Sequence, residues 1–112
     1  MLSLELEDRA YKALGHRDRR RILRAIGTEE RPVGALADEV GLAQPIASQH
    51  LRVLRDAGLV QVRADGNRRF YAVEFGVVSE LRTFLDQFWS DRLARLQQVA
   101  EAQPDPEASE GD

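Results

Sequence analysis

The fold is decided by residues 31–60, which read RPVGALADEVGLAQPIASQHLRVLRDAGLV. Apolar residues recur there at three- and four-residue steps, and they predict one helix over 33–40 and another from about residue 44 to Ala57. Gly41 is expected to end the first helix. A proline at the start of the second is tolerated, because a first-turn N–H has no partner within the helix. The stretch therefore predicts two helices joined by a three-residue turn that contains glycine.

Two further helices are predicted before this stretch. Apolar residues mark a first helix over about residues 4–14, with Gly15 as its stop. Asp18 is expected to be the N-cap of the next helix, RRRILRAI at 19–26, which has an apolar stripe opposite its arginines. Residues 28–31 are expected to form a polar loop.

After residue 58 the periodicity changes. LVQVRA at 59–64 and RRFYAV at 68–73 are rich in β-branched and aromatic residues, and Asp65-Gly66-Asn67 between them predicts a hairpin. Residues 76–99 then predict one helix of roughly 35 Å, more than so small a domain needs to close its core. The predicted class is mainly α with a small β-hairpin. The order α-α-α-α-β-β-α is that of a winged helix-turn-helix, here expected to be dimeric.

Length and composition agree with one soluble domain. The chain has 112 residues, of which 43% are hydrophobic and 31% charged. The absence of cysteine excludes disulfides, thiolate zinc sites and cysteine nucleophiles. No apolar run approaches the roughly 18 residues of a membrane span and no signal peptide is recognisable, so we expect a cytoplasmic protein. We expect one domain over 1–99 and a disordered acidic tail over 100–112, AEAQPDPEASEGD.

The net charge of −3 is unevenly distributed. Residues 101–112 hold five of the 19 acids and no base, so the rest of the chain has 16 bases against 14 acids, a net +2. Fifteen of the 16 bases are arginine, which suits bidentate contacts to phosphate or guanine. This surplus points to nucleic acid only if the arginines gather on one surface.

The helix that begins near residue 44 turns its polar residues outward. A helix-turn-helix presents the first turns of its second helix to the major groove, where polar side chains reach base edges. The residues expected to face outward are Gln44, Ile46, Ser48, Gln49, Arg52 and Arg55. We expect Gln44, Ser48, Gln49 and Arg52 to contact DNA.

The hairpin adds basic residues beside this helix. Arg63, Asn67, Arg68 and Arg69 surround its turn, and we expect them near phosphates or the minor groove. The run Arg19–Arg21 forms a second basic cluster, which is typical of a solvated helix face but also suits phosphate contact.

Three segments together resemble the ArsR/SmtB family of bacterial winged-helix regulators. They are ALGHRDRRRIL at 13–23, the stretch 31–60 and VRADGNRRFYAV at 62–73. The resemblance covers about residues 10–75. It implies a homodimer built from the first and last helices, which binds an imperfect inverted repeat in double-stranded DNA and represses transcription. It places Gln44, Ser48, Gln49 and Arg52 at base-facing positions and Arg68 and Arg69 on the wing.

The chain departs from that family at the sensing positions. Metal-sensing members often carry a cysteine pair on the third helix, where residues 32–36 read PVGAL, and others carry histidine on the last helix, where 76–99 has none. The two histidines are His16 and His50. His50 is expected to be structural.

A divalent metal such as nickel or zinc is therefore expected to have only a weak candidate ligand, His16. Its partners would be acids such as Glu7, Asp8 or Asp18. The sequence predicts no metal site with a stronger set of ligands.

The apolar residues of the first and last predicted helices indicate a dimer. The last helix has large aromatic residues close together and apolar residues on more than one face, which marks a partner interface. The predicted interface residues are Leu4, Leu6, Tyr11, Leu81, Phe84, Leu85, Phe88 and Trp89. A twofold axis there would place two recognition helices one DNA turn apart, about 34–36 Å.

Functions other than a DNA-binding repressor were also considered, and some of them remain open. An enzyme is excluded, because Ser48 and His50 lie two residues apart on a helix and face away from each other, and no glycine-rich phosphate loop is present. An activator, or a regulator that relies on a protein co-regulator for ligand sensing, would fit the missing sensor residues. A protein-interaction module that does not bind DNA would not need the arginine wing.

Overall fold

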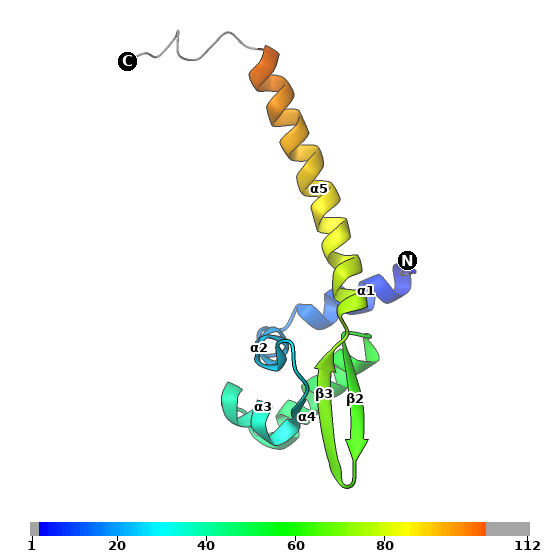
Figure 1. The fold of residues 1–112 in the computed structure, drawn as a ribbon, viewed down its shortest axis with the longest axis vertical. Helices are drawn as coiled ribbons and strands as arrows, with labels where there is room; N and C mark the ends of the chain where they lie inside the picture. Colours follow the sequence, from blue (N-terminus) through cyan, green and yellow to red (C-terminus); the bar gives the residue numbers. More distant parts are fainter. Residues whose placement is uncertain (1–2, 103–112) are drawn as a thin grey trace, which may run out of the picture. The chain divides into compact units, whose positions relative to one another are not determined.

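The structure, a computed structural model, describes residues 3–102 and confirms the predicted fold class (Figure 1). Five helices accompany a three-stranded antiparallel sheet in those residues. In chain order they are α1 (Leu4–Leu14), α2 (Arg17–Ile26), β1 (Arg31–Pro32), α3 (Val33–Val40), α4 (Gln44–Asp56), β2 (Val60–Asp65), β3 (Arg68–Val73) and α5 (Phe75–Ala102).

Within the described residues, those from 3 to 80 form one compact unit around a helical core. Helices α2, α3 and α4 pack against one another, and α1 packs on α2 and α4. The largest fully buried side chains are Ile22, Leu36, Leu51, Leu54 and Leu59. Truncating one such leucine to alanine typically costs about 2–5 kcal/mol. The buried stripe of α4 therefore holds this helix in place and leaves its opposite face to solvent.

The turn between α3 and α4 forms as the sequence predicts. Gly41 adopts φ +71°, a left-handed conformation that favours glycine, and the N–H of Leu42 donates to the carbonyl of Ala37 at 3.0 Å. Ala43 precedes α4 without a side-chain cap, and Pro45 lies in its first turn. The first turn of α4 thus keeps backbone N–H groups that no side chain satisfies.

The N-cap of α2 is His16, so the prediction of Asp18 is wrong. The Nδ1 atom of His16 accepts from the N–H of Asp18 at 3.1 Å, and the helix begins at Arg17. Asp18 lies inside the first turn, where its Oδ1 accepts from Arg21 at 2.9 Å. The carboxylate is therefore directed along the helix to an arginine one turn later and not back to the chain end.

The predicted loop 28–31 is also partly wrong, because Arg31 and Pro32 form the short strand β1. It pairs antiparallel with β3 (Arg31 with Tyr71, Pro32 with Phe70), which gives the sheet order β1-β3-β2. Proline is tolerated here because β1 is an edge strand. A two-residue strand has no periodicity of its own, so the sequence could not reveal it.

The hairpin β2–β3 has the predicted turn. Asp65 pairs with Arg68, which leaves Gly66 and Asn67 as a two-residue loop, and Gly66 has φ +66°. A positive φ at the first central position is typical of a type II′ hairpin turn. In Figure 1 the hairpin extends past α3 and α4, so its turn stands clear of the helical core.

Helix α5 has 28 residues and is longer at both ends than the predicted 76–99. Its length corresponds to about 42 Å. Within the described residues, those from 81 to 102 belong to a second unit. Of the predicted acidic tail, residues 100–102 belong to α5, and 103–112 lie outside the described residues. None of the helices in the described part is long and apolar enough to cross a membrane.

Candidate nucleic-acid interface

A groove between α3, α4 and the hairpin gathers seven of the eight residues predicted to contact DNA. Those seven are Gln44, Ser48, Gln49, Arg52, Asn67, Arg68 and Arg69. The remaining lining residues are Pro32, Val33, Gly34, Ala35, Asp38, Arg55 and Tyr71. Four arginines therefore face one aspartate along this surface, which makes the groove electropositive.

The α4 side of the groove follows from helical spacing. Gln44, Ser48 and Arg52 are four residues apart and lie along one face of the helix. Ser48 is half-buried, whereas Gln44, Gln49 and Arg52 are exposed. Glutamine and arginine are the side chains that reach adenine and guanine edges in the major groove. The arrangement can thus present hydrogen-bonding groups to bases along about two turns of helix.

The hairpin side supplies guanidinium groups close to α4. Arg68 and Arg69 begin β3, directly after the turn residue Asn67. The guanidinium carbon of Arg68 lies 5.1 Å from the ring centroid of Phe70, a cation–π contact that steadies the side chain. These groups suit phosphates that flank a helix lying in the major groove.

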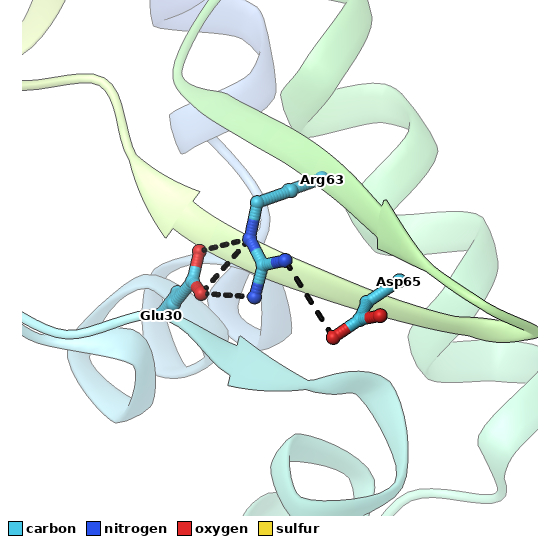
Figure 2. A network of polar contacts seen from close by, with 3 residues as sticks. All are labelled: Glu30, Arg63 and Asp65. Carbon is cyan, nitrogen blue, oxygen red and sulfur yellow. Dashed lines mark hydrogen bonds and ion pairs between the residues drawn. The ribbon is translucent and has the colours of Figure 1, made fainter.

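Arg63 does not line the groove with the other seven residues. Its guanidinium makes a bidentate contact to Glu30, with Nη2 2.6 Å from Oε1 and Nε 3.2 Å from Oε2, and Asp65 lies 3.8 Å away (Figure 2). It also stacks on Phe70, 4.9 Å from the ring centroid. Arg63 thus ties the hairpin to the segment before β1.

The ion pair shifts the acid–base properties of both partners. The hydrogen bond from Arg63, together with its charge, holds the pKa of Glu30 below its usual value. The same hydrogen bond and charge raise the pKa of Arg63, with a smaller contribution from Asp65. Both groups are therefore ionised at neutral pH, and much of the positive charge of Arg63 is already compensated.

The side chains of the basic run 19–21 make hydrogen bonds within the fold. Nε of Arg19 donates to the carbonyl of Ala13 at 2.6 Å, and Arg20 donates to the carbonyl of Leu14 at 2.7 Å. Arg21 donates to Asp18 and, at 2.7 Å, to the carbonyl of Val40. These arginines satisfy carbonyls at the C-terminal ends of α1 and α3, where cations are favoured.

His16 lies beside His50 and Asp18, and Asp18 is one of the acids predicted as its partners. The two imidazole rings have centroids 4.5 Å apart. Burial lowers the pKa of the half-buried His50, as do the nearby His16 and Arg19, while Asp18 acts in the opposite direction. The hydrogen bond from Arg21 lowers the pKa of Asp18.

The residues predicted to form a dimer interface are mostly exposed. Within the second unit, Phe88 is 68% and Trp89 56% exposed, and Phe84 and Leu85 are exposed to a similar extent. On α1, Leu4 and Leu6 are exposed and Tyr11 is half-buried. Leu81 differs from the others, because it is buried within the single chain.

The sequence prediction missed three features of these surfaces. Arg55 lines the groove one turn after Arg52, and its outward position on α4 was the available signal. Glu30 as the partner of Arg63 is 33 residues away in the chain, and no local pattern indicates such a pair. No local pattern indicates that His50 lies beside His16 either.

Comparisons with known proteins agree with this geometry. The family described as "Helix-turn-helix domain" matches residues 14–63. The HTH-type transcriptional regulator Rv2034 of Mycobacterium tuberculosis is 38% identical over 98 residues, which cover 88% of this chain and 92% of that protein. The chain belongs to the ArsR family of winged helix-turn-helix transcriptional regulators.

Two solved structures support the assignment to the ArsR family. The homodimeric winged helix-turn-helix DNA-binding domain of Mb0332 from Mycobacterium bovis, a possible ArsR-family regulator, has a TM-score of 0.65 and 30% identity, covering 82% of this chain and 85% of that one. NolR from Sinorhizobium fredii has a TM-score of 0.61 and 33% identity, covering 79% and 95%. Membership of this family confirms the prediction of a DNA-binding transcriptional regulator that is not an enzyme.

Proposed function

We propose that this ArsR-family chain is a dimeric repressor that binds an inverted-repeat operator through the groove between α4 and the hairpin. The observation that carries the proposal is the convergence of Gln44, Ser48, Gln49 and Arg52 with the hairpin residues on one electropositive surface. Such a surface suits a duplex, whose bases lie in a groove flanked by phosphates. The site of action would be the cytoplasm, where bacterial DNA is found.

The residues have distinct roles in this proposal. Gln44, Ser48, Gln49 and Arg52 read base edges, whereas Asn67, Arg68 and Arg69 contact backbone or minor groove. Arg63 holds the middle of the hairpin to Glu30, in place of the DNA contact expected from the sequence. Arg55 extends the phosphate contacts along α4.

The exposed apolar surface of α5 favours association with a second copy. The exposed stripe of α5 continues beyond the aromatic residues through Leu93, Leu96 and Val99, each about half exposed. A stripe of this size in water favours association. Because the Mb0332 domain is homodimeric and belongs to the same fold, a second copy of this chain is the partner we propose for the stripe. A protein co-regulator is not needed for DNA binding in this scheme.

Selection of bound duplexes from a random pool tests the proposal. We expect enrichment of an inverted repeat whose half-sites are centred about 10–10.5 base pairs apart, or a multiple of it. Transcription in vitro from a promoter that overlaps the selected sequence should then fall as protein is added. Recovery of no common sequence would contradict the operator, and increased transcription would contradict repression.

A further inference from the structure

Three potential metal ligands lie together on the side of α4 that does not face the groove. His16 precedes α2, Asp18 lies in its first turn, and His50 is on α4. One ligand atom from each lies within 4.8 Å of the other two. The residues come from positions 16–18 and 50, so only the packing of α2 on α4 brings them together.

We propose that His16, Asp18 and His50 form a binding site for a divalent first-row transition metal ion, with Zn²⁺ or Ni²⁺ as the suited ions. Two imidazoles and one carboxylate match the ligand preference of these metals, whereas Mg²⁺ and Ca²⁺ prefer oxygen ligands. Three protein ligands leave at least one position for water, as in open zinc sites. Neither the groove residues nor the predicted dimer residues take part.

Asp18 keeps one carboxylate oxygen for a metal ion. Arg21 occupies Oδ1 of Asp18 at 2.9 Å and leaves Oδ2 for a cation. Such a contact orients a coordinating carboxylate from outside the metal site.

The three ligand atoms must move closer together to bind one metal ion. With bonds of about 2.0–2.1 Å, ligand atoms around a tetrahedral metal are separated by about 3.3 Å. The observed limit of 4.8 Å therefore calls for a shift of roughly 1.5 Å or less, which rotations of the three side chains can supply.

Metal binding is coupled to the start of α2. Nδ1 of His16 uses its lone pair to accept from the N–H of Asp18. Coordination through Nδ1 replaces this hydrogen bond, and coordination through Nε2 places the proton on Nδ1, which then cannot accept. Either mode exchanges the cap for a metal bond that joins α2 to α4. The nearby positive charges of Arg19 and Arg21 weaken the site relative to a closed four-ligand zinc centre.

Titration of the full chain, free of any histidine tag, with Zn²⁺ in a calorimeter tests the site. We expect one Zn²⁺ per chain, a higher melting temperature with Zn²⁺ than without, and no response to Mg²⁺. His16→Asn keeps a good N-cap but removes the imidazole, and His50→Gln keeps a side chain of similar length. Each should weaken Zn²⁺ binding at least tenfold.

The matched control is Glu29→Gln, which removes an exposed carboxylate outside the cluster and should bind Zn²⁺ like the unchanged chain. Circular dichroism establishes that each variant is folded. Absence of Zn²⁺ binding by the folded unchanged chain would overturn the proposal. Undiminished binding by both folded histidine variants would also overturn it, because the metal would then be held elsewhere.

Discussion

At the scale of single residues, base recognition depends on the polar face of α4. Replacing Gln49 or Ser48 by alanine should reduce the preference for operator over random DNA by about 1–3 kcal/mol for each lost base contact. Affinity for random DNA should change little, since neither side chain is charged. Competition gel shifts with both kinds of duplex measure the ratio of the affinity for operator to the affinity for random DNA. Equal losses on operator and random DNA would show that these residues contact only the backbone.

The Glu30–Arg63 pair makes a pH-dependent contribution to stability. The pKa of Glu30 is lower in the folded chain than its usual 4.5, so the ion pair stabilises the fold above that pH and the contribution is lost as pH falls below it. Glu30→Gln should therefore lower the melting temperature at pH 7 and have little effect at about pH 3. Thermal melts at both pH values, with Glu29→Gln as control, measure this difference. An equal loss at both pH values would contradict the assignment.

The residue scale also shows where sequence reasoning stops. Gln44, Ser48 and Arg52 could be placed correctly, because helical spacing alone determines which side chains share a face. Arg63 and Glu30 could not be paired, since their contact depends on how β2 lies beside the segment before β1. The cap of α2 was misassigned because Asp18 and His16 are both able to cap, and the competing contact to Arg21 decides between them.

At the scale of elements, the hairpin is expected to contribute affinity without sequence preference. Arg68→Ala with Arg69→Ala should weaken binding to all duplexes alike and reduce the slope of log affinity against log salt by about 1–2, because each lost phosphate contact releases about one counterion fewer. Arg24→Ala with Arg82→Ala removes the same charge outside the groove and serves as control. If the hairpin variant keeps the affinity and slope of the unchanged chain, the hairpin does not contact DNA.

Most elements could be predicted from sequence because each has a local signal. Helices α1, α3 and α4 show apolar periodicity with a glycine stop, and the hairpin shows its turn residues. Strand β1 lacks such a signal, because two residues become a strand only when β3 lies beside them.

At the scale of the whole molecule, the account requires two copies. Phe88→Glu with Trp89→Glu places charges on the exposed apolar stripe and should yield a monomer by light scattering. Operator affinity should fall at least about 100-fold, because the two half-sites would no longer be bound by one linked pair of domains. Gln87→Glu with Ser90→Glu adds the same charge to the polar face of α5 and should remain dimeric. A monomeric unchanged chain at micromolar concentration would refute the dimer.

The most direct measurement of the central claim is a salt titration of binding to DNA. Gel shifts from low to physiological salt compare two kinds of DNA fragment of equal length. One is the region upstream of the gene that encodes this chain, which is a natural candidate operator, and the other is random sequence. We predict that both bind at low salt and that only the upstream region stays bound as salt rises, because base contacts persist when phosphate contacts are screened. Identical binding curves for the two kinds of fragment at every salt concentration would contradict recognition of DNA by the groove between α4 and the hairpin.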